Sequence, residues 1–288
     1  MVRKGNLLYN GDFETGTLED WEHGPYGLSA QCNFGVSTVD KYRGSYSGEF
    51  QAFEDFAESY VAYNKVCSFE EYEAFLYIIY AKKSYGHYAQ PILYGLDDKG
   101  NLIKTIALSW LTENDIWKRN LVLIRQFGDI THFKVGYHYK AVNSGDCCFI
   151  DEAKLLGYKS IKSLILNDSV YKENVTSNTY YNFSLGCFGR CKVVSIIKVE
   201  DVSGTDPTLD VKLSACLLDD STICIDTSHE TITSAGTYVL ETEFPEIAWL
   251  HADYIVGGTS PSFTFKHVIR VYPLADVGCS EGSGGTVL

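Results

Sequence analysis

The chain of 288 residues lacks the features of several protein classes. It has no apolar run of about 18 residues, which a membrane-spanning helix requires. Basic side chains are few, with 24 lysines and arginines against 37 aspartates and glutamates and a net charge of −13. A general nucleic-acid binder needs a basic surface, so this charge argues against that function. No apolar segment follows Arg3 and Lys4, so we expect no secretory signal peptide.

Motifs that carry catalysis are missing as well. The sequence contains no phosphate-binding P-loop, no H-E-x-x-H and no G-x-G-x-x-G. Seven histidines are scattered along the chain without a shared spacing. Glycosidase chemistry would need two carboxylates at a defined separation across a cleft. We therefore expect a protein that is not an enzyme.

The residues that are present favour β-structure. Hydrophobic residues make up 45% and aromatic residues 14%, including 21 tyrosines, and there are 25 glycines. Aromatic side chains suit a pleated surface, and glycine suits turns. Residues 75–80, 121–124 and 133–139 form short apolar or alternating runs, and 97–101 is a turn between two such runs. With no convincing long amphipathic helix, the sequence predicts an all-β fold.

A change in composition near residues 157–160 predicts two domains. Tyrosine, tryptophan and phenylalanine dominate before it, whereas threonine, serine, valine and isoleucine dominate after it. We expect one β-sandwich over 1–157 and a smaller β-sandwich over 158–288 that ends in a flexible C-terminal tail. Residues 202–211 and 256–265 share the frame V-x-G-T-x-P-[S/T] followed by alternation. This repeat predicts two equivalent hairpins of one sandwich.

Nine cysteines leave several interpretations open, and their odd number excludes complete pairing within the chain. They are either small buried apolar residues or partners in a disulfide, with Cys187–Cys191 and Cys216–Cys224 as the two candidate pairs. A zinc site is disfavoured, because only 187–191 has knuckle-like spacing and no second half follows.

The string at residues 6–16, N-L-L-Y-N-G-D-F-E-T-G, is followed by Trp21 and, much later, by I-D-E-A-K-L at 150–155. Together these resemble the opening and closing strands of jelly-roll carbohydrate-binding modules, over about residues 5–157. The resemblance implies a structural calcium ion where those strands meet, with Glu14 and Asp151 as carboxylate ligands. Asp12 would assist, and the backbone near Lys41 would supply a carbonyl. Otherwise these acids face solvent or pair with lysine.

The same resemblance implies glycan binding through exposed aromatic rings. Trp21 and Trp117 match positions that pack in the core of such modules. The candidate glycan-binding residues are Tyr85, Tyr88, Tyr94, Trp110, Tyr137 and Tyr139, with His87 and Gln90 as hydroxyl partners. The alternative is that these tyrosines are half-buried sheet residues or contacts with other proteins.

A second resemblance covers about residues 190–272. The strings V-S-G-T-D-P-T-L-D-V-K-L at 202–213 and Y-I-V-G-G-T-S-P-S-F-T-F at 254–265 are similar to small β-sandwich proteins of tailed phages. Residues 219–224 depart from the D-G-x-T-W turn that those proteins often carry, so the local core is expected to be repacked.

Together the two resemblances imply a virion structural protein of a tailed phage, either a capsid decoration or a protein of the tail or fibre. It would be made in the host cytoplasm and released by lysis. Its partners would be major capsid or tail proteins, further copies of itself and a surface glycan, with neither nucleic acid nor membrane insertion. One alternative is a carbohydrate-binding module protein that assists polysaccharide degradation, and another is a purely architectural protein.

Overall fold

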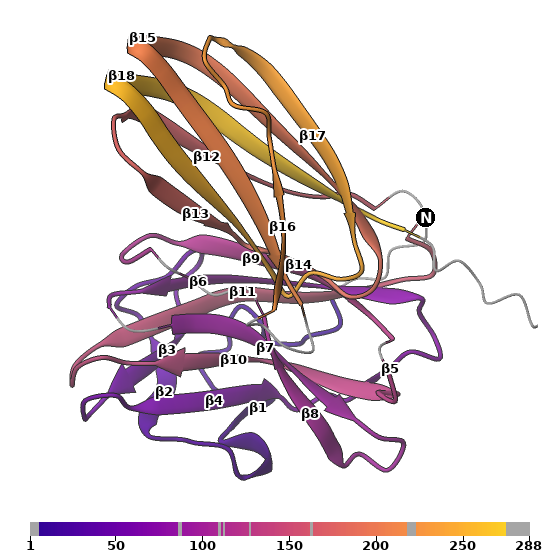
Figure 1. Cartoon of the computed structure of the whole chain (residues 1–288). Coiled ribbons are helices and arrows are strands. Elements are labelled where there is room, and N and C mark those ends of the chain that lie inside the picture. The colour runs from indigo at the N-terminus through magenta and orange to yellow at the C-terminus, as the bar shows by residue number, and fades with distance from the viewer. Residues whose placement is uncertain are drawn as a thin grey trace, which may run out of the picture.

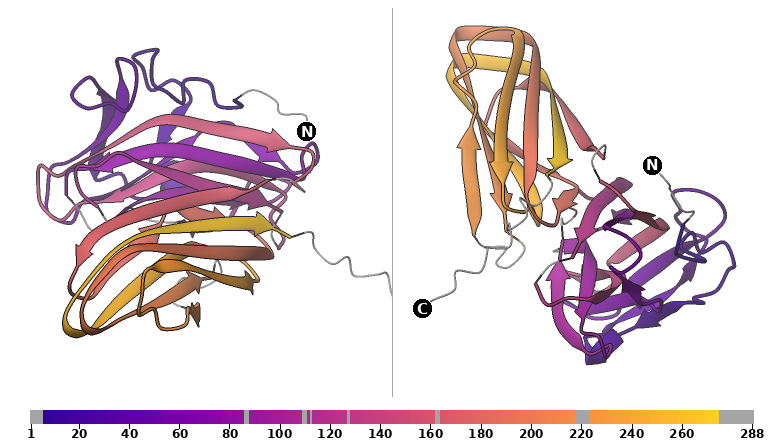
Figure 2. Two further views of the ribbon diagram at one scale, coloured as in Figure 1. Left: turned by 90° about the horizontal axis from the view of Figure 1, so that it is seen from above. Right: turned by 90° about the vertical axis from the view of Figure 1, so that its right-hand side faces the viewer.

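The computed structural model describes residues 6–85, 88–108, 111, 113–126, 128–161, 164–217 and 223–274. These residues form three β-sheets, and their helical content is a single 3-10 turn at Pro25–Gly27. The predicted all-β fold is therefore confirmed. The three sheets lie one above another, with the C-terminal strands stacked on one side of the N-terminal sandwich (Figures 1 and 2).

The sheet farthest from the C-terminal strands is called the outer sheet here. Its strands, in spatial order, are β1 (Trp21–His23), β4 (Glu58–Tyr63), β10 (His132–Lys140), β7 (Tyr88–Leu96) and β8 (Leu102–Ala107), with β5 (Cys67–Ser68) paired to the start of β10. Every pairing in this sheet is antiparallel.

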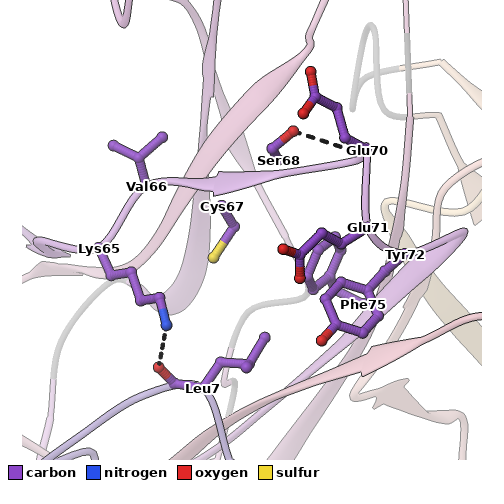
Figure 3. A pocket seen from close by; sticks show the side chains of 9 residues that line it. All are labelled: Leu7, Lys65, Val66, Cys67, Ser68, Glu70, Glu71, Tyr72 and Phe75. Carbon is purple, nitrogen blue, oxygen red and sulfur yellow. Dashed lines mark hydrogen bonds between the residues drawn. The ribbon is translucent and has the colours of Figure 1, made fainter. Parts of the chain in front are cut away.

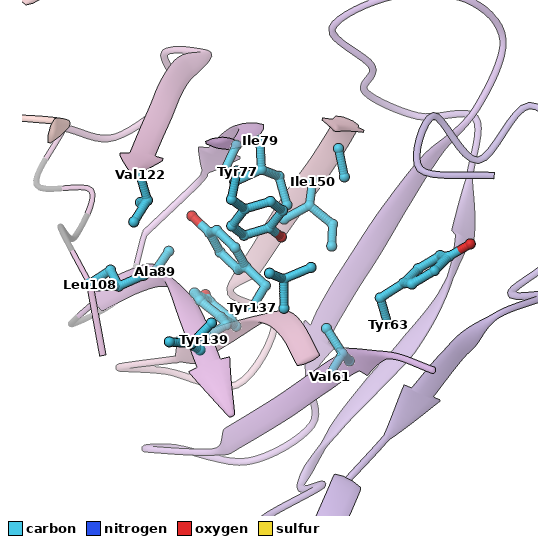
Figure 4. Packing of buried hydrophobic residues seen from close by; sticks show 14 of the residues in the cluster. Val61, Tyr63, Tyr77, Ile79, Ala89, Leu108, Val122, Tyr137, Tyr139 and Ile150 are labelled. Carbon is cyan, nitrogen blue, oxygen red and sulfur yellow. The ribbon is translucent and has the colours of Figure 1, made fainter. Parts of the chain in front are cut away.

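The second sheet, the middle sheet, completes the N-terminal sandwich. Its order is β14 (Leu185–Cys187), β9 (Lys118–Arg125), β6 (Ala74–Lys83), β11 (Cys147–Tyr158), β3 (Ser47–Ala52) and β2 (Cys32–Ser37). Alternating residues of both sheets fill the space between them, among them Tyr77, Val122, Tyr137 and Tyr139 (Figure 4). Trp21 also lies in this core, as the resemblance implied.

Part of the opposite face of the middle sheet, over β6, β9 and the end of β11, is covered by the C-terminal half. Leu76 on β6, Leu123 on β9 and Leu156 on β11 point away from the first core and join a second one, which includes Phe183 and Leu250. In addition, β14 pairs in parallel with β9, although it follows the predicted domain boundary in sequence. The two halves therefore share both a sheet and a hydrophobic core.

The third sheet is folded over on itself and is called the folded sheet here. Its strands are β12 (Leu166–Val175), β13 (Thr179–Phe183), β15 (Cys191–Cys216), β16 (Cys224–Ser228), β17 (Gly236–Phe244) and β18 (Trp249–Pro273). The long strands β15 and β18 pair antiparallel from end to end. One end of this pair joins β12 and β17 and the other joins β13 and β16, which makes two layers around a shared core.

The two copies of the repeated motif form the bend between these layers. Gly204 and Gly258 have φ angles of 113° and 106°, which are accessible to glycine. A Cβ on Gly204 would lie 2.6 Å from the Ser260 carbonyl oxygen, and one on Gly258 would lie 2.5 Å from that of Asp206. The repeats thus face each other across one strand pair, so their interpretation as two hairpins was wrong.

One of the two disulfides left open by the sequence is formed, between Cys216 and Cys224. Cys187 and Cys191 are buried free thiols. Within the described part of the chain, no helix is long and apolar enough to cross a membrane. The predicted C-terminal tail begins beyond residue 274 and lies outside the described residues.

Candidate functional site: the free face of the outer sheet

The two outward surfaces of the N-terminal sandwich differ. The middle sheet's surface is partly buried against the C-terminal half, over β6, β9 and the end of β11, whereas the outer sheet's surface lies on the far side of the molecule (Figure 1). We call this second surface the free face. Because side chains alternate along a strand, His138 and Lys140 of β10 lie on the free face while Tyr137 and Tyr139 enter the core.

His138 is the centre of a hydrogen-bonded group on this face. Its ring stacks on Tyr60 of β4, with ring centroids 3.9 Å apart and planes 5° apart, and meets the Tyr88 ring of β7 edge-on at 5.1 Å. Its Nε2 lies 2.8 Å from Glu58 Oε1, and its Nδ1 lies 3.0 Å from the Gln90 amide nitrogen. Three neighbouring strands thus contribute to one cluster.

The protonation state of this cluster follows from burial. His138 is 2% exposed, and burial lowers its pKa to about 4 even though Glu58 acts in the opposite direction. The ring is therefore neutral near pH 7. Its Nε2–H donates to Glu58, and its Nδ1 accepts from the Gln90 amide. The carboxylate also accepts from the Tyr60 hydroxyl at 3.1 Å, which fixes the orientation of all four side chains.

A second group lies farther along the same strands. Lys134 of β10 is 3.3 Å from Glu22 of β1 and 5.2 Å from the centroid of the Tyr26 ring. Tyr26 is 38% exposed, and its ring covers that of Tyr94 at 5.9 Å. An exposed aromatic ring is here combined with one cation and one carboxylate.

The row between these two groups is built from small and apolar residues. Ala62 of β4, Gly136 of β10 and Ile92 of β7 lie side by side across the sheet. A Cβ on Gly136 would come within 2.0 Å of the Val61 carbonyl oxygen, so glycine is required there. This face therefore alternates aromatic rings with fixed hydrogen-bonding groups, an arrangement that suits sugar rings and their hydroxyls.

Three of the predicted glycan-binding tyrosines are corrected by the structure. Tyr94, Tyr137 and Tyr139 are each 0% exposed, so none offers a ring face to a ligand. Tyr137 and Tyr139 pack between the two sheets (Figure 4). Tyr94 is on the free face but is covered by its neighbours, and its hydroxyl donates to the Val61 carbonyl.

The other predicted glycan-binding residues have different positions. Tyr88 is half-buried on the free face beside His138, and Gln90 is buried next to it. Tyr85 is 52% exposed and follows β6, and its carbonyl accepts from Tyr139. Trp110 and His87 lie outside the described residues. Trp117 is half-buried, and its indole donates to Asp40.

The predicted calcium ligands are placed around one loop, residues 38–46. Asp151 Oδ2 accepts from the backbone N–H groups of Tyr42 and Arg43, and Glu14 Oε1 accepts from those of Ser45 and Tyr46. Asp12 accepts from the Glu14 backbone instead. The Lys41 ammonium donates to the Thr38 carbonyl.

This geometry gives the two carboxylates a role that needs no metal, because each of them anchors the loop. Asp151 is 0% exposed, and burial raises its pKa to about 6. No group of three or more histidine, cysteine, aspartate or glutamate side chains suited to a metal occurs among the described residues. A calcium ion bound here would therefore need backbone carbonyl oxygens to complete its six to eight ligands.

The residues missed by the sequence analysis are Glu58, Tyr60 and His138. The alternation of 133–139 showed that His138 faces away from Tyr137, and that signal was available. It did not show which face was free, nor that Tyr60 would stack on His138, because β4 and β10 are far apart in sequence.

No family model matches the chain, and no curated protein sequence matches it. Solved structures similar to it include a xylan-binding domain of family 22, with 17% identity, a TM-score of 0.41, and coverage of 55% of this chain and 97% of the other. A family 61 module in complex with β-1,4-galactotriose has 17% identity, a TM-score of 0.39, and coverage of 53% and 98%.

Tailspike protein 4 of bacteriophage CBA120 is also similar in part. Its enzymatically active domain has 11% identity, a TM-score of 0.42, and coverage of 52% of this chain and 21% of the other. Carbohydrate-binding modules thus recur among the similar structures. At these identities and TM-scores the likenesses say nothing about the ligand of this chain.

Proposed function

We propose that the protein is a non-catalytic glycan-binding protein and that its free face binds an oligosaccharide. The observation that carries the proposal is the cluster of Tyr60, Tyr88 and His138 with Glu58 and Gln90. Sugar rings stack on aromatic faces, and their hydroxyls need donors and acceptors that are already oriented. Glu58, Tyr60 and Tyr88 are partly exposed on one side of one sheet, and the buried His138 and Gln90 hold them in place.

We further propose that the protein is a structural component of a tailed-phage virion, either on the capsid or with the tail or fibre. The resemblance of residues 190–272 to phage β-sandwich proteins supports this placement. The architecture is compatible with it, because the free face lies opposite the C-terminal half (Figure 1). In this arrangement the C-terminal half contacts capsid or tail proteins while the free face remains accessible to a glycan.

Glycan binding is tested with an array of plant and microbial glycans, followed by titration calorimetry on the best ligand. We expect Tyr88→Ala to weaken binding by about three- to tenfold, since aromatic stacking contributes about 0.5–1.5 kcal/mol. Tyr88→Phe keeps the ring and should bind nearly as well. Tyr171→Ala is a matched control, because Tyr171 is 53% exposed on β12 of the C-terminal half.

The outcomes separate the candidate roles. Equal affinity of wild type and Tyr88→Ala would refute the free face as the site. An array without any bound glycan would favour a purely architectural protein. Neighbouring genes for a portal or a major capsid protein would support the virion placement, whereas glycosidase genes would favour a module that assists polysaccharide degradation.

A further inference from the structure

We propose a second carbohydrate-binding site, which takes a single pyranose residue, in a pocket at the end of the N-terminal sandwich. The pocket has a volume of about 320 Å³ and lies between β5, the chain leading into β6, and the N-terminal segment. Its lining residues are Leu7, Lys65, Val66, Cys67, Ser68, Glu70, Glu71, Tyr72 and Phe75 (Figure 3). No residue of the free-face cluster is among them.

The walls of the pocket combine apolar surfaces with a few polar groups. Tyr72 is 7% exposed and Phe75 is 1% exposed, and their rings form one side of the space. The Lys65 ammonium lies on the other side, 3.4 Å from the Leu7 carbonyl oxygen (Figure 3). The lining is therefore mixed, and small-molecule sites also combine apolar surfaces with oriented polar groups.

The thiol of Cys67 is part of the pocket lining. Cys67 is only 7% exposed, and its sulfur points into the space between the Lys65 side and the Tyr72 side (Figure 3). Burial raises its pKa to about 11, so the group is a neutral thiol near pH 7. The interior of the pocket is therefore uncharged, and the charges are confined to its rim.

The charges on the rim favour a neutral, hydroxyl-rich ligand. Lys65 is one cation and Glu70 and Glu71 are two carboxylates, all exposed. Two carboxylates repel a phosphate or sulfate group, and the described residues contain no cluster of three histidine, cysteine, aspartate or glutamate side chains suited to a metal ion. Carboxylates accept hydrogen bonds from hydroxyls and the ammonium donates to them, so this set suits the equatorial hydroxyls of a sugar held in the pocket. The pocket volume lies at the lower end of the range for small-ligand sites, which begins at about 300 Å³, so it is large enough for one ring.

The pocket and the free face are separate sites. Cys67 pairs with Phe133 at the start of β10, while the cluster centre His138 lies five residues farther along the same strand. At about 3.3 Å per residue this corresponds to about 16 Å. The pocket therefore does not depend on the proposed function of the free face, and each site can be removed without the other.

The test uses the full chain carrying Tyr60→Ala and Tyr88→Ala, which removes the rings of the free face. Saturation-transfer NMR is recorded with methyl glycosides of glucose, galactose, mannose and N-acetylglucosamine at millimolar concentration. We expect at least one glycoside to bind this variant and to lose about tenfold in affinity when Lys65→Met or Glu70→Gln is added. Glu73→Gln is the matched control, because Glu73 is exposed close by and does not line the pocket.

Location is tested through Cys67. The bound glycoside should slow the alkylation of Cys67 severalfold, read by mass spectrometry, and leave the half-exposed Cys147 unchanged. Binding of none of the four glycosides to the free-face variant would overturn the proposal. Binding that neither Lys65→Met nor Glu70→Gln weakens, and that does not slow the alkylation of Cys67, would also overturn it. If the free face bound no glycan while the pocket did, that result would refute the proposed function and leave the proposal for the pocket supported.

Discussion

Acid should destabilise the C-terminal half through a chain of buried polar groups. The Tyr254 hydroxyl lies 2.8 Å from His267 Nδ1, and Ser195 Oγ lies 2.7 Å from Nε2 of both His267 and His229. All four residues are at most 8% exposed. Burial lowers the pKa of His229 to about 4 and that of His267 to about 3, from 6.5. Both imidazoles are therefore neutral in the folded state and become charged on unfolding in acid.

The size of the stability loss follows from the linkage between protonation and folding. Because the folded pKa values lie below the unfolded value, this stability is fully present above pH 6.5. It is lost as the pH falls from 6.5 toward 4. One pKa unit corresponds to about 1.4 kcal/mol, so near pH 4.5 each histidine costs about 2 to 3 kcal/mol. Two such histidines cost about 5 kcal/mol, a large part of the usual stability of a domain.

The assay is urea unfolding followed by circular dichroism between about pH 7.5 and 4.5. His267→Gln keeps hydrogen-bonding groups but cannot take up the proton, so it should lose about half as much stability as wild type over this range. Buried carboxyls such as Asp168 have a raised pKa, so their contribution to stability changes with pH in the opposite direction. They are the same in both proteins and therefore cancel when the stability loss of His267→Gln is subtracted from that of wild type. His132→Gln, in the other half, is the control. Identical pH dependence of wild type and His267→Gln would refute the reasoning.

Two further predictions concern the bend and the calcium ligands. Gly258→Ala should cost about 2 kcal/mol or more, because it adds a Cβ beside the Asp206 carbonyl oxygen at a positive φ; a thermal melt unchanged from wild type would contradict this. The calcium implied by the resemblance predicts that millimolar calcium raises the melting temperature and that Glu14→Gln removes the rise. A melt insensitive to both calcium and a chelator would exclude the metal.

The class of fold could be predicted from the sequence because alternation is a local property. Residues 133–139 alternate, and β10 spans them. That pattern correctly grouped Tyr137 with Tyr139 but left open whether this side faced the core or solvent. The answer depends on strands brought in from elsewhere, since the free face is defined by what the C-terminal half covers on the other side of the sandwich.

The repeated motif at 202–211 and 256–265 also shows how little of the long-range pairing can be predicted from local sequence. Glycine at 204 and 258 correctly indicated positive φ angles, but both residues lie inside the strands β15 and β18 and form no chain-reversing turn. These two segments pair with each other, and no local sequence pattern predicts that pairing. The parallel addition of β14 to β9 was equally inaccessible, because it joins three residues to a strand more than sixty positions earlier in the chain.

The parallel pair β14–β9 has a mechanical consequence. A ligand held on the free face and an attachment through the C-terminal half would pull the molecule from opposite sides. The force would reach the shared middle sheet through two routes, the hydrogen bonds of β14 and the apolar contacts of the second core. The two halves would then respond to tension as one rigid unit rather than as two domains joined by a flexible linker. The bound glycan would therefore keep a fixed orientation under load.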